Sequence, residues 1–327
     1  MQYRPLGRTG FEGSSISFGA WAIGGTWGEV DDAASLRTLH RALDLGVNFF
    51  DTADVYGDGH SERLIARLRS ERKEPFWVAT KVGRRASPHD AKSYTRDNLT
   101  AYVERCLRNL RVSAVDLLQI HCPPTDVFYM PEVFGVFDDL VEAGKVRFYG
   151  ASVERVEEGL KALEYPKLQT LQVVFNILRQ RPIERLFPQA LERRVGILAR
   201  LPLSSGMLTG KLSRATQFHP DDHRHFNRHG EAFSKGETFS GFDYDKSLAV
   251  VEKLRALLPR EMTLPELALR FIASFPAVTC SIPGARRPEQ VEQNVKAGEK
   301  GPLSAELIQA LVGIYASDVK PFVHQLW

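Results

Sequence analysis

The feature that most constrains the fold is a repeated alternation of two kinds of segment. Between Ser17 and Gly284, short apolar runs alternate with longer segments whose apolar residues recur at helical spacing. The short runs predict eight strands, the number that an α/β fold of the (β/α)8 or TIM barrel type requires. They are expected at Ile16–Ala20, Asn48–Ala53, Trp77–Val82, Val115–Cys122, Val146–Ser152, Thr170–Phe175, Gly196–Leu203 and Thr279–Pro283. An open sheet covered on both faces would give a similar pattern, so the alternation alone leaves that alternative open.

Three segments add to this repeat. Residues 1–13 contain a Gly7-Arg8-Thr9-Gly10 turn between short apolar stretches, which predicts an N-terminal β-hairpin that plugs one end of the barrel. Ser213–Asp245, a long loop after the seventh strand, exceeds an ordinary connection and is expected to lie over the active site as a lid. An extra C-terminal helix completes the prediction. We expect one domain over residues 1–327, although two domains are possible at this length.

The helix before the last strand has the clearest start signal. Thr263 followed by Glu266 has the spacing of a capping box, in which side chains satisfy the first backbone N–H groups of a helix. Leu267, Phe271 and Phe275 then give this helix one apolar face. The spacing therefore predicts a helix that begins just after Thr263 and packs against the sheet.

Charge and cysteine content narrow the class of protein. The formal net charge is +3, and Lys and Arg are mixed with Asp and Glu along the chain, which disfavours nucleic acid as a partner. We see no signal peptide and no uncharged run of transmembrane length. Cys106, Cys122 and Cys280 are widely spaced and predict neither a disulfide framework nor a zinc site. We expect a soluble, cytoplasmic protein without a membrane partner.

Four polar residues at or just after consecutive strand ends are the strongest functional signal. Asp51, Lys81 and His121 stand near the carboxyl ends of the second, third and fourth predicted strands, and Tyr56 follows the second. Barrel chemistry occurs at the carboxyl ends of strands. Each residue alone has an ordinary explanation: a turn cap, a packed aromatic ring or a core histidine. A lysine in an apolar strand is harder to explain, because a buried ammonium needs a partner or a lowered pKa. Together the four residues predict one catalytic site.

This combination suits the reduction of a carbonyl group. The reaction needs a proton at oxygen while a hydride reaches carbon, and a tyrosine with a pKa of about 10 is a poor acid unless its anion is stabilised. We expect Lys81 to lower the pKa of Tyr56, and Asp51 to keep Lys81 charged and oriented. His121 is expected to donate a hydrogen bond that orients the carbonyl oxygen.

With these residues in view, the sequence resembles the aldo-keto reductase superfamily, in the branch related to potassium-channel β subunits. The family's Asp/Tyr/Lys/His tetrad falls on the four residues named above. The resemblance covers nearly the whole chain through residues 51–62 (DTADVYGDGHSE), 150–152 (GAS), 172–176 (QVVFN), 202–211 (PLSSGMLTGK) and 282–286 (IPGAR). It implies a (β/α)8 barrel that binds a dinucleotide without a Rossmann motif, and this chain contains no G-x-G-x-x-G.

The resemblance also implies a set of cofactor contacts. Ser152 and Gln172 would bind the nicotinamide carboxamide, although strand-end turn chemistry also explains both. Arg286 precedes a helix that opens at Pro288, where a ribose 2′-phosphate can bind, so NADP(H) is expected and NAD(H) is disfavoured; Arg287 is an alternative ligand. The full set of cofactor-binding residues is Gly19, Trp21, Ser152, Gln172, Arg200, Pro202, Leu203, Ser205, Gly206, Lys211, Gly284, Arg286, Gln290, Gln293 and Asn294.

Two positions depart from the family pattern. Val153 stands where Asn or Arg is common, so one contact to the cofactor is expected to be missing. Arg200 stands where many members have an aromatic residue that stacks on the nicotinamide. A guanidinium can also stack on a π face, but its charge would disfavour the oxidised cofactor. The alternative for Arg200 is a solvent-facing side chain or an ion pair with an acid of the lid.

The other candidate features are weaker. His219, His223, His225 and His229, with Asp221 and Asp222, resemble a loose metal cluster, but they lack a regular spacing, and no metal site is predicted. Trp21 and Trp27, with Tyr56 and His121, are expected to form the substrate pocket, although core packing explains the tryptophans almost as well.

The sequence therefore predicts an NADPH-dependent reductase of a small aldehyde or ketone, with Tyr56 as general acid. One alternative is a dehydrogenase that oxidises a polyol, sugar or inositol. Another is a regulatory β-subunit-like protein that binds the cofactor, which is disfavoured because the chain lacks the long N-terminal extension that such subunits often have. The sequence does not indicate the substrate or the oligomeric state.

Overall fold

Eight parallel strands form the centre of the protein in a computed structural model that describes residues 1–25 and 31–327. In sheet order each strand pairs with its neighbour along the chain. The strands are β3 (Phe18–Gly19), β4 (Phe49–Asp51), β5 (Trp77–Val82), β6 (Val115–His121), β7 (Val146–Ser152), β8 (Thr170–Val174), β9 (Gly196–Arg200) and β10 (Val278–Ile282). Parallel bridges from Ile16 to Ser281 and from Gly19 to Gly284 join the two outer strands. The barrel is thereby closed, and the open-sheet alternative is wrong.

The strand predictions are confirmed in number and order, with small errors at the ends. The largest error is at β9, which ends at Arg200 and not at Leu203. Leu201 has a φ of 56°, in the left-handed region, so the backbone cannot continue as a strand there. The last strand also begins one residue earlier than predicted, at Val278.

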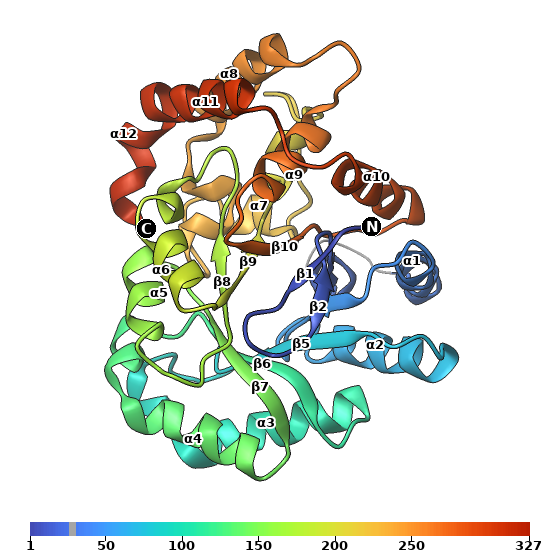
Figure 1. Cartoon of the computed structure of the whole chain (residues 1–327), viewed down its shortest axis with the longest axis vertical. Coiled ribbons are helices and arrows are strands. Elements are labelled where there is room, and N and C mark those ends of the chain that lie inside the picture. The colour runs from blue at the N-terminus through green and yellow to red at the C-terminus, as the bar shows by residue number, and fades with distance from the viewer. Residues whose placement is uncertain (26–30) are drawn as a thin grey trace.

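Helices surround the barrel, as Figure 1 shows. Those that follow strands are α1 (Asp32–Asp44), α2 (His60–Glu71), α3 (Arg96–Leu110), α4 (Pro131–Glu142), α5 (Val156–Ala162), α6 (Leu186–Glu192), α9 (Leu264–Ala273) and α10 (Pro288–Glu299). The predicted cap of α9 is confirmed, because the Thr263 side chain accepts a hydrogen bond from the Glu266 N–H at 3.3 Å. Leu267 and Phe271 on this helix are fully buried, so its apolar face packs against the barrel as expected.

Short turns and extra helices complete the chain. The 3-10 segments are η1 (Ala20–Ile23), η2 (Ala91–Ser93), η3 (Thr125–Tyr129), η4 (Arg181–Ile183), η5 (Ser204–Thr209), η6 (Lys235–Glu237), η7 (Phe239–Gly241) and η9 (His324–Leu326), and η8 (Tyr315–Val319) is a π-helical turn. The remaining helices are α7 (His223–Phe226), α8 (Tyr244–Leu257), α11 (Ala305–Ile314) and α12 (Lys320–Val323). The last two confirm the predicted C-terminal helical addition.

The N-terminal hairpin closes one end of the barrel, as predicted. It consists of β1 (Tyr3–Pro5) and β2 (Glu12–Ser14), and Leu6 between them belongs to the apolar cluster inside the barrel. Phe11 stacks on Trp77 with ring centroids 3.6 Å apart. A Cβ on Gly7 would lie 2.2 Å from the Gln169 carbonyl oxygen, and its φ is 59°, so this turn requires glycine. The barrel is therefore filled at this end.

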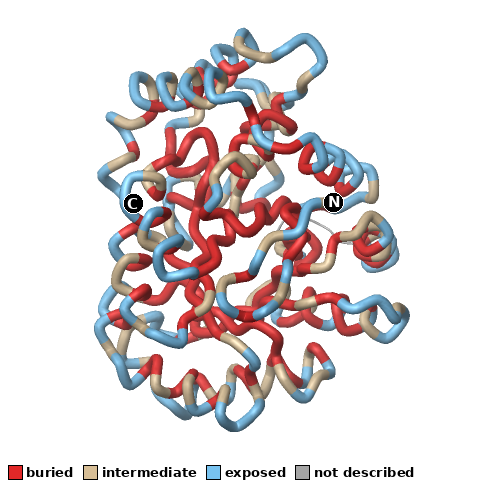
Figure 2. The backbone as a smooth tube through the Cα atoms, in the orientation of Figure 1, coloured by how far each residue is buried: buried red, intermediate tan, exposed pale blue. Residues whose placement is uncertain are grey.

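Buried residues run through the middle of the molecule, and exposed ones lie on the outer faces of the helices (Figure 2). The long segment after β9, from Leu201 to Asp243, contains η5, α7, η6 and η7 and lies over the opposite end of the barrel from the hairpin. It supplies Phe233 and Glu237 to the cavity there, which confirms the predicted lid. Among the described residues, no helix is long and apolar enough to cross a membrane.

Candidate active site

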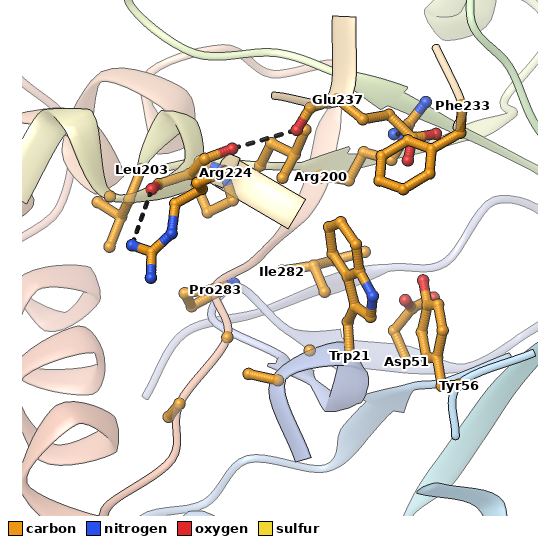
Figure 3. A pocket seen from close by; sticks show the side chains of 18 of the residues that line it. Trp21, Asp51, Tyr56, Arg200, Leu203, Arg224, Phe233, Glu237, Ile282 and Pro283 are labelled. Carbon is orange, nitrogen blue, oxygen red and sulfur yellow. Dashed lines mark hydrogen bonds and ion pairs between the residues drawn. The ribbon is translucent and has the colours of Figure 1, made fainter. Parts of the chain in front are cut away.

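A cavity of about 900 Å³ opens at the carboxyl ends of the strands, beneath the lid. In Figure 3, Trp21, Asp51 and Tyr56 stand on the barrel side of this cavity, and Arg200, Phe233 and Glu237 stand across from them. A cavity of this size is in the range of sites that bind cofactors and small molecules. The residues that line it therefore define the candidate site.

The four residues predicted to be catalytic lie together at one side of the cavity. The Lys81 Nζ donates hydrogen bonds to Asp51 Oδ1 at 2.6 Å, to the Thr52 carbonyl oxygen at 2.7 Å and to Tyr56 Oη at 3.4 Å. The Tyr56 and His121 rings are perpendicular, with centroids 6.0 Å apart. Lys81 is completely buried, and its three donor positions all have partners. We call these four residues, Asp51, Tyr56, Lys81 and His121, the tetrad.

The second carboxylate oxygen of Asp51 has two amide partners. The Gln172 Nε2 donates to Asp51 Oδ2 at 2.7 Å, and the Gln119 Nε2 donates at 3.3 Å. Gln172 thus holds Asp51 with the amide group that the sequence assigned to the nicotinamide. Gln119 was missed by the sequence reasoning, although a signal existed: it lies two residues before His121 in β6, and residues at that spacing point to the same side of a strand.

Burial and neighbouring charge set the protonation of the tetrad. Burial raises the pKa of Tyr56 above its ordinary value, and this effect outweighs the opposing effect of Lys81. Lys81 therefore lowers the pKa of Tyr56, as expected, but it does not bring that pKa below its ordinary value. Burial alone would lower the pKa of Lys81, but Asp51 and Tyr56 raise it above its usual value. Burial, with Arg84 and Lys81 nearby, holds the pKa of His121 well below its usual range. At neutral pH the site contains an ammonium, a neutral phenol and a neutral imidazole.

Across the cavity lies a second set of paired charges, Arg84, Glu154, Arg200 and Glu237, which we call the quartet. Glu237 is buried, and the other three are partly buried. Arg84 binds both oxygens of Glu237, with Nη2–Oε1 at 2.7 Å and Nη1–Oε2 at 3.2 Å. Arg200 binds Glu237 Oε1 at 3.2 Å and Glu154 Oε1 at 3.3 Å. The alternative interpretation of Arg200, an ion pair with an acid of the lid, is what the structure shows. Arg200 also lines the cavity.

The two carboxyl groups of the quartet differ in acidity. Burial would raise the pKa of Glu237, but Arg84 and Arg200 hold it well below its usual range. Burial and the negative charge of Glu237 raise the pKa of Glu154, against the opposing effect of Arg200. Glu237 is therefore the more acidic of the two carboxyl groups, and it is the member of the quartet that comes from the lid.

Only part of the quartet had a sequence signal. The unusual charge of Arg200 was noted, and Arg84 and Glu154 each follow a strand end by two residues, where functional residues of barrels are found. Glu237 comes from an irregular segment 153 positions after Arg84, and no local pattern connects the two. Its place in the quartet could be found only from the fold.

Two carboxyl groups of the quartet, Glu154 and Glu237, also belong to a candidate metal site. Cys122, Glu154 and Glu237 form the one group in the described chain whose potential ligand atoms all lie within 4.8 Å of one another. Arg84 and Arg200 already supply two positive charges to these carboxyl groups, so a cation would meet two guanidinium groups there. The histidine-rich stretch is not in this group. His223 is buried against the Trp21 ring, with centroids 4.7 Å apart.

Most of the predicted cofactor residues line the cavity. They are Gly19, Trp21, Gln172, Arg200, Pro202, Leu203, Ser205, Gly206, Lys211, Gly284, Arg286 and Gln290, together with Arg287. Ser152, Gln293 and Asn294 do not line it, and their roles stay predictions. The Ser152 Oγ lies 3.3 Å from the Cys122 Sγ. Trp27, predicted to form the substrate pocket, lies outside the described residues.

The start of α10 has the local structure that a phosphate-binding helix would need. Pro288 is the first residue of the helix, and the Gln290 Oε1 accepts hydrogen bonds from the backbone N–H groups of Arg286 at 2.7 Å and Arg287 at 3.2 Å. Gln290 was expected to bind the cofactor, and in the structure its side chain caps the helix. Both arginines stand at the helix N-terminus beside the cavity, where positive charge and the helix dipole both favour an anion.

Comparison with known proteins is consistent with this geometry. A family model described as "Aldo/keto reductase family" matches residues 15–316. Aldo-keto reductase YhdN of Bacillus subtilis (strain 168) is 31% identical over 298 residues, which cover 89% of this chain and 87% of that protein. The NADH-specific methylglyoxal reductase of Escherichia coli (strain K12) is 28% identical, over 91% and 93% of the two chains. The glycerol dehydrogenase AKR11B4 from Gluconobacter oxydans has a similar structure, with a TM-score of 0.78, 31% identity and coverage of 97% and 96%.

Proposed function

The chain belongs to the aldo/keto reductase family, and from this premise we propose that it reduces an aldehyde or ketone to the alcohol with NADPH. The observation that carries the proposal is the contact of Lys81 Nζ with Tyr56 Oη at 3.4 Å, backed by Asp51 at 2.6 Å. A phenol that lines a cavity and has a buried ammonium beside it can act as a proton donor. We also propose that residues 1–327 form one domain.

The proton step follows from the contacts of the tetrad. The Tyr56 Oη donates its proton to the carbonyl oxygen of the substrate, and the Lys81 ammonium stabilises the phenolate that remains. Asp51, held by Gln172 and Gln119, keeps Lys81 charged at a fixed position. A positioned general acid of this kind accelerates a reaction by about 10² to 10⁴-fold.

The neutral state of His121 suits a second role. A neutral imidazole can donate one N–H to the carbonyl oxygen and orient it toward Tyr56. An imidazolium there would instead compete with Lys81 for the phenolate. Because burial and the nearby cations Arg84 and Lys81 keep His121 neutral, we assign it to positioning the substrate.

The residues around the other end of the cavity fit a dinucleotide phosphate. Ser205 and Gly206 have φ values of 54° and 95°, and this turn presents backbone to the cavity. Lys211, Arg286 and Arg287 supply positive charge. The bound cofactor would supply the hydride that reaches the carbonyl carbon. Two arginines at the N-terminus of α10 favour NADP(H) over NAD(H), because a 2′-phosphate is doubly charged and matches a guanidinium fork.

The direct test of the proposal is a screen for NADPH oxidation over aldehydes, ketones and sugars. For the best substrate we expect Tyr56→Phe to lower kcat/KM by about 10³-fold, because a general acid is lost. The dissociation constant for NADPH and the circular dichroism spectrum should stay unchanged. Full activity of the Tyr56→Phe protein would show that the proton step assigned here is wrong.

The cofactor preference has its own test. We expect Arg286→Ala to reduce the ratio of kcat/KM for NADPH over NADH by about tenfold, the loss of one charge-assisted contact to phosphate. The activity with NADH should change much less, which serves as the internal control. An unchanged ratio would place the 2′-phosphate elsewhere, and Arg287→Ala would then be the next variant to measure.

A second direction of reaction is favoured by one comparison. The solved structure at 31% identity is that of a glycerol dehydrogenase. The same tetrad can work in reverse, with Tyr56 accepting the proton of an alcohol. Initial rates in both directions with each cofactor would separate a reductase from a polyol dehydrogenase.

A further inference from the structure

The part of the lid that presents Glu237 has an unusual backbone. Phe239, Ser240 and Gly241 are three consecutive residues with positive φ, at 50°, 59° and 73°. For residues other than glycine, this conformation costs about 1 kcal/mol or more each and persists only when the surroundings enforce it. The segment Gly236–Gly241 therefore needs contacts that hold it in place.

Polar contacts supply part of that support. The Asn176 Nδ2 donates to the Ser240 Oγ at 2.9 Å, and the Ser204 Oγ lies 2.9 Å from the same atom. The Ser205 Oγ donates to the Glu237 carbonyl oxygen at 3.1 Å. These bonds attach the segment to the ends of the barrel strands beneath it. They do not cover its other face.

Trp327 covers that face. A Cβ on Gly236 would lie 2.8 Å from the Trp327 Nε1, and one on Gly241 would lie 2.0 Å from its Cη2. The indole therefore contacts the backbone at both ends of the segment that carries Glu237. Trp327 is 8% exposed, whereas its neighbour Leu326 is 42% exposed.

A buried cation holds the indole from another side. The Arg179 guanidinium lies 4.1 Å from the centroid of the Trp327 ring, and its Nη2 donates to the Glu154 carbonyl oxygen at 2.9 Å. The Nη1 of Arg179 is buried and has no hydrogen-bond partner among the described residues. The cation–π contact with the Trp327 ring therefore offsets part of the cost of burying this guanidinium. Trp327, Arg179 and Glu154 thus form a chain of contacts that reaches the quartet.

We propose that Trp327 is a positioning residue, which clamps the segment Gly236–Gly241 so that the Glu237 carboxylate reaches Arg84 and Arg200. It touches neither the cavity nor the tetrad and acts only through Glu237 and the wall of the pocket. Without the indole, the strained backbone relaxes and Glu237 leaves the quartet. The kinetic consequences rest on the proposed reductase function, but the structural consequence does not.

The kinetic test compares Trp327→Ala with Leu326→Ala as an exposed control. We expect Trp327→Ala to raise the KM for the carbonyl substrate about tenfold and to change kcat less than about threefold, because a pocket wall binds substrate and transition state alike. Trp327→Phe should restore most of the loss, since it keeps an aromatic face for Arg179. A fall in melting temperature with unchanged KM would show a merely structural role and overturn the proposal.

A double variant separates positioning from general stability. In a Glu237→Gln background, Trp327→Ala should raise KM no further, because both changes act on the same contact. Additive effects on KM would contradict the proposal. If Trp327→Ala does not fold, Gly236→Ala replaces it. The added Cβ would lie 2.4 Å from the Arg179 Nη1 and 2.8 Å from the Trp327 Nε1, so it pushes on both side chains without removing either, and the same rise in KM is expected.

Deuterium exchange tests the clamp without any activity. In the protein without ligands, Trp327→Ala should speed amide exchange of residues 237–241 by about tenfold and leave β4 to β6 unchanged. Unchanged exchange in 237–241 would refute the clamp even if the enzyme reduces carbonyl compounds. Faster exchange in a protein that oxidises no NADPH would support the clamp and reject the proposed function.

Discussion

The tetrad and the quartet face each other across one cavity, and both pair opposite charges. They differ in how those charges are held. Three members of the tetrad lie within or at the ends of adjacent strands β4, β5 and β6, and Tyr56 follows β4 by five residues. The quartet joins three strand ends, at β5, β7 and β9, to one residue of the lid.

This difference separates two tasks of a binding site. The strands fix Asp51, Lys81 and His121 before any ligand arrives, as a proton transfer requires. The ion pairs of the quartet form only when the lid places Glu237 beside Arg84 and Arg200. The quartet therefore depends on the position of the lid, whereas the tetrad does not. We therefore expect changes in the tetrad to act on kcat, and changes in the quartet to act on KM.

The largest effect should come from removing the cation of the tetrad. Lys81→Met is expected to lower kcat/KM by about 10³-fold, because the phenolate of Tyr56 loses its counter-ion. It should also reduce the free energy of unfolding by about 3 kcal/mol, because the buried Asp51 carboxylate loses its only ion-pair partner among the described residues. Steady-state kinetics and thermal unfolding would measure both.

The matched change in the quartet is Arg200→Met. Arg84 still pairs with Glu237 in that variant, so we expect less than a tenfold loss in kcat/KM. If Lys81→Met and Arg200→Met lowered kcat equally, the proposed difference between the tetrad and the quartet would be wrong. Arg200 would then take part in the proton step.

An effect of similar size is expected for Glu237→Gln, and it should fall on KM. The change removes the lid anion and leaves Glu154 to balance Arg84 and Arg200. We expect KM to rise about tenfold, because the part of the lid that forms one wall of the substrate pocket is held less firmly. The value of kcat should stay within about threefold of the original, because the proton donor Tyr56 is intact. A selective loss of kcat, measured under saturating substrate, would contradict the division of tasks.

The smallest effect on activity is expected at Asp54, a buried acid with no hydrogen-bond partner for its carboxylate in the described chain. Burial and Glu62 raise its pKa from 3.8 to about 7. The folded state therefore binds this proton more tightly than the unfolded state. The stabilisation is fully present below about pH 4 and is lost as the pH rises through about 7.

Asp54→Asn should remove this dependence, because an amide of the same shape stays neutral. We expect its free energy of unfolding to exceed that of the original protein by about 2 kcal/mol at pH 8, with a smaller gap at pH 5. Urea unfolding at both pH values would measure the gap. A gap that does not change with pH would show that Asp54 is not the group responsible.

The comparison also shows what the sequence can predict. The strands were predictable because parallel strands covered by helices are apolar on successive residues, and the four polar residues of the tetrad stood out against that background. Errors at strand ends, such as Leu201, arose because a left-handed backbone conformation leaves little trace in residue type. The lid was predicted as a lid from its length alone.

Contacts between irregular segments could not be predicted. Glu237 meets Arg84, and Trp327 meets Gly236, only because the folded chain brings loops together, and neither pair has a periodic pattern. The net direction of the Tyr56 pKa was also not predictable, because the sequence shows the neighbouring charge of Lys81 but not the extent of burial that opposes it. The sequence therefore predicted which residues form the tetrad better than it predicted how deeply they are buried and which loop residues surround them.

The seam that closes the barrel has a consequence for how the chain is made. It joins Ser17 to Ser281, residues 264 positions apart, through a hydrogen bond of 3.0 Å from the Ser17 Oγ to the Ser281 carbonyl oxygen. During synthesis β3 is made long before β10, its partner across the seam. Until β10 is made, the edge of the sheet at β3 is unpaired, and other chains can form hydrogen bonds with it. Closure of the ring is therefore a late, long-range event. We expect chaperones to be needed most in that interval, after the tetrad strands exist and before the seam forms.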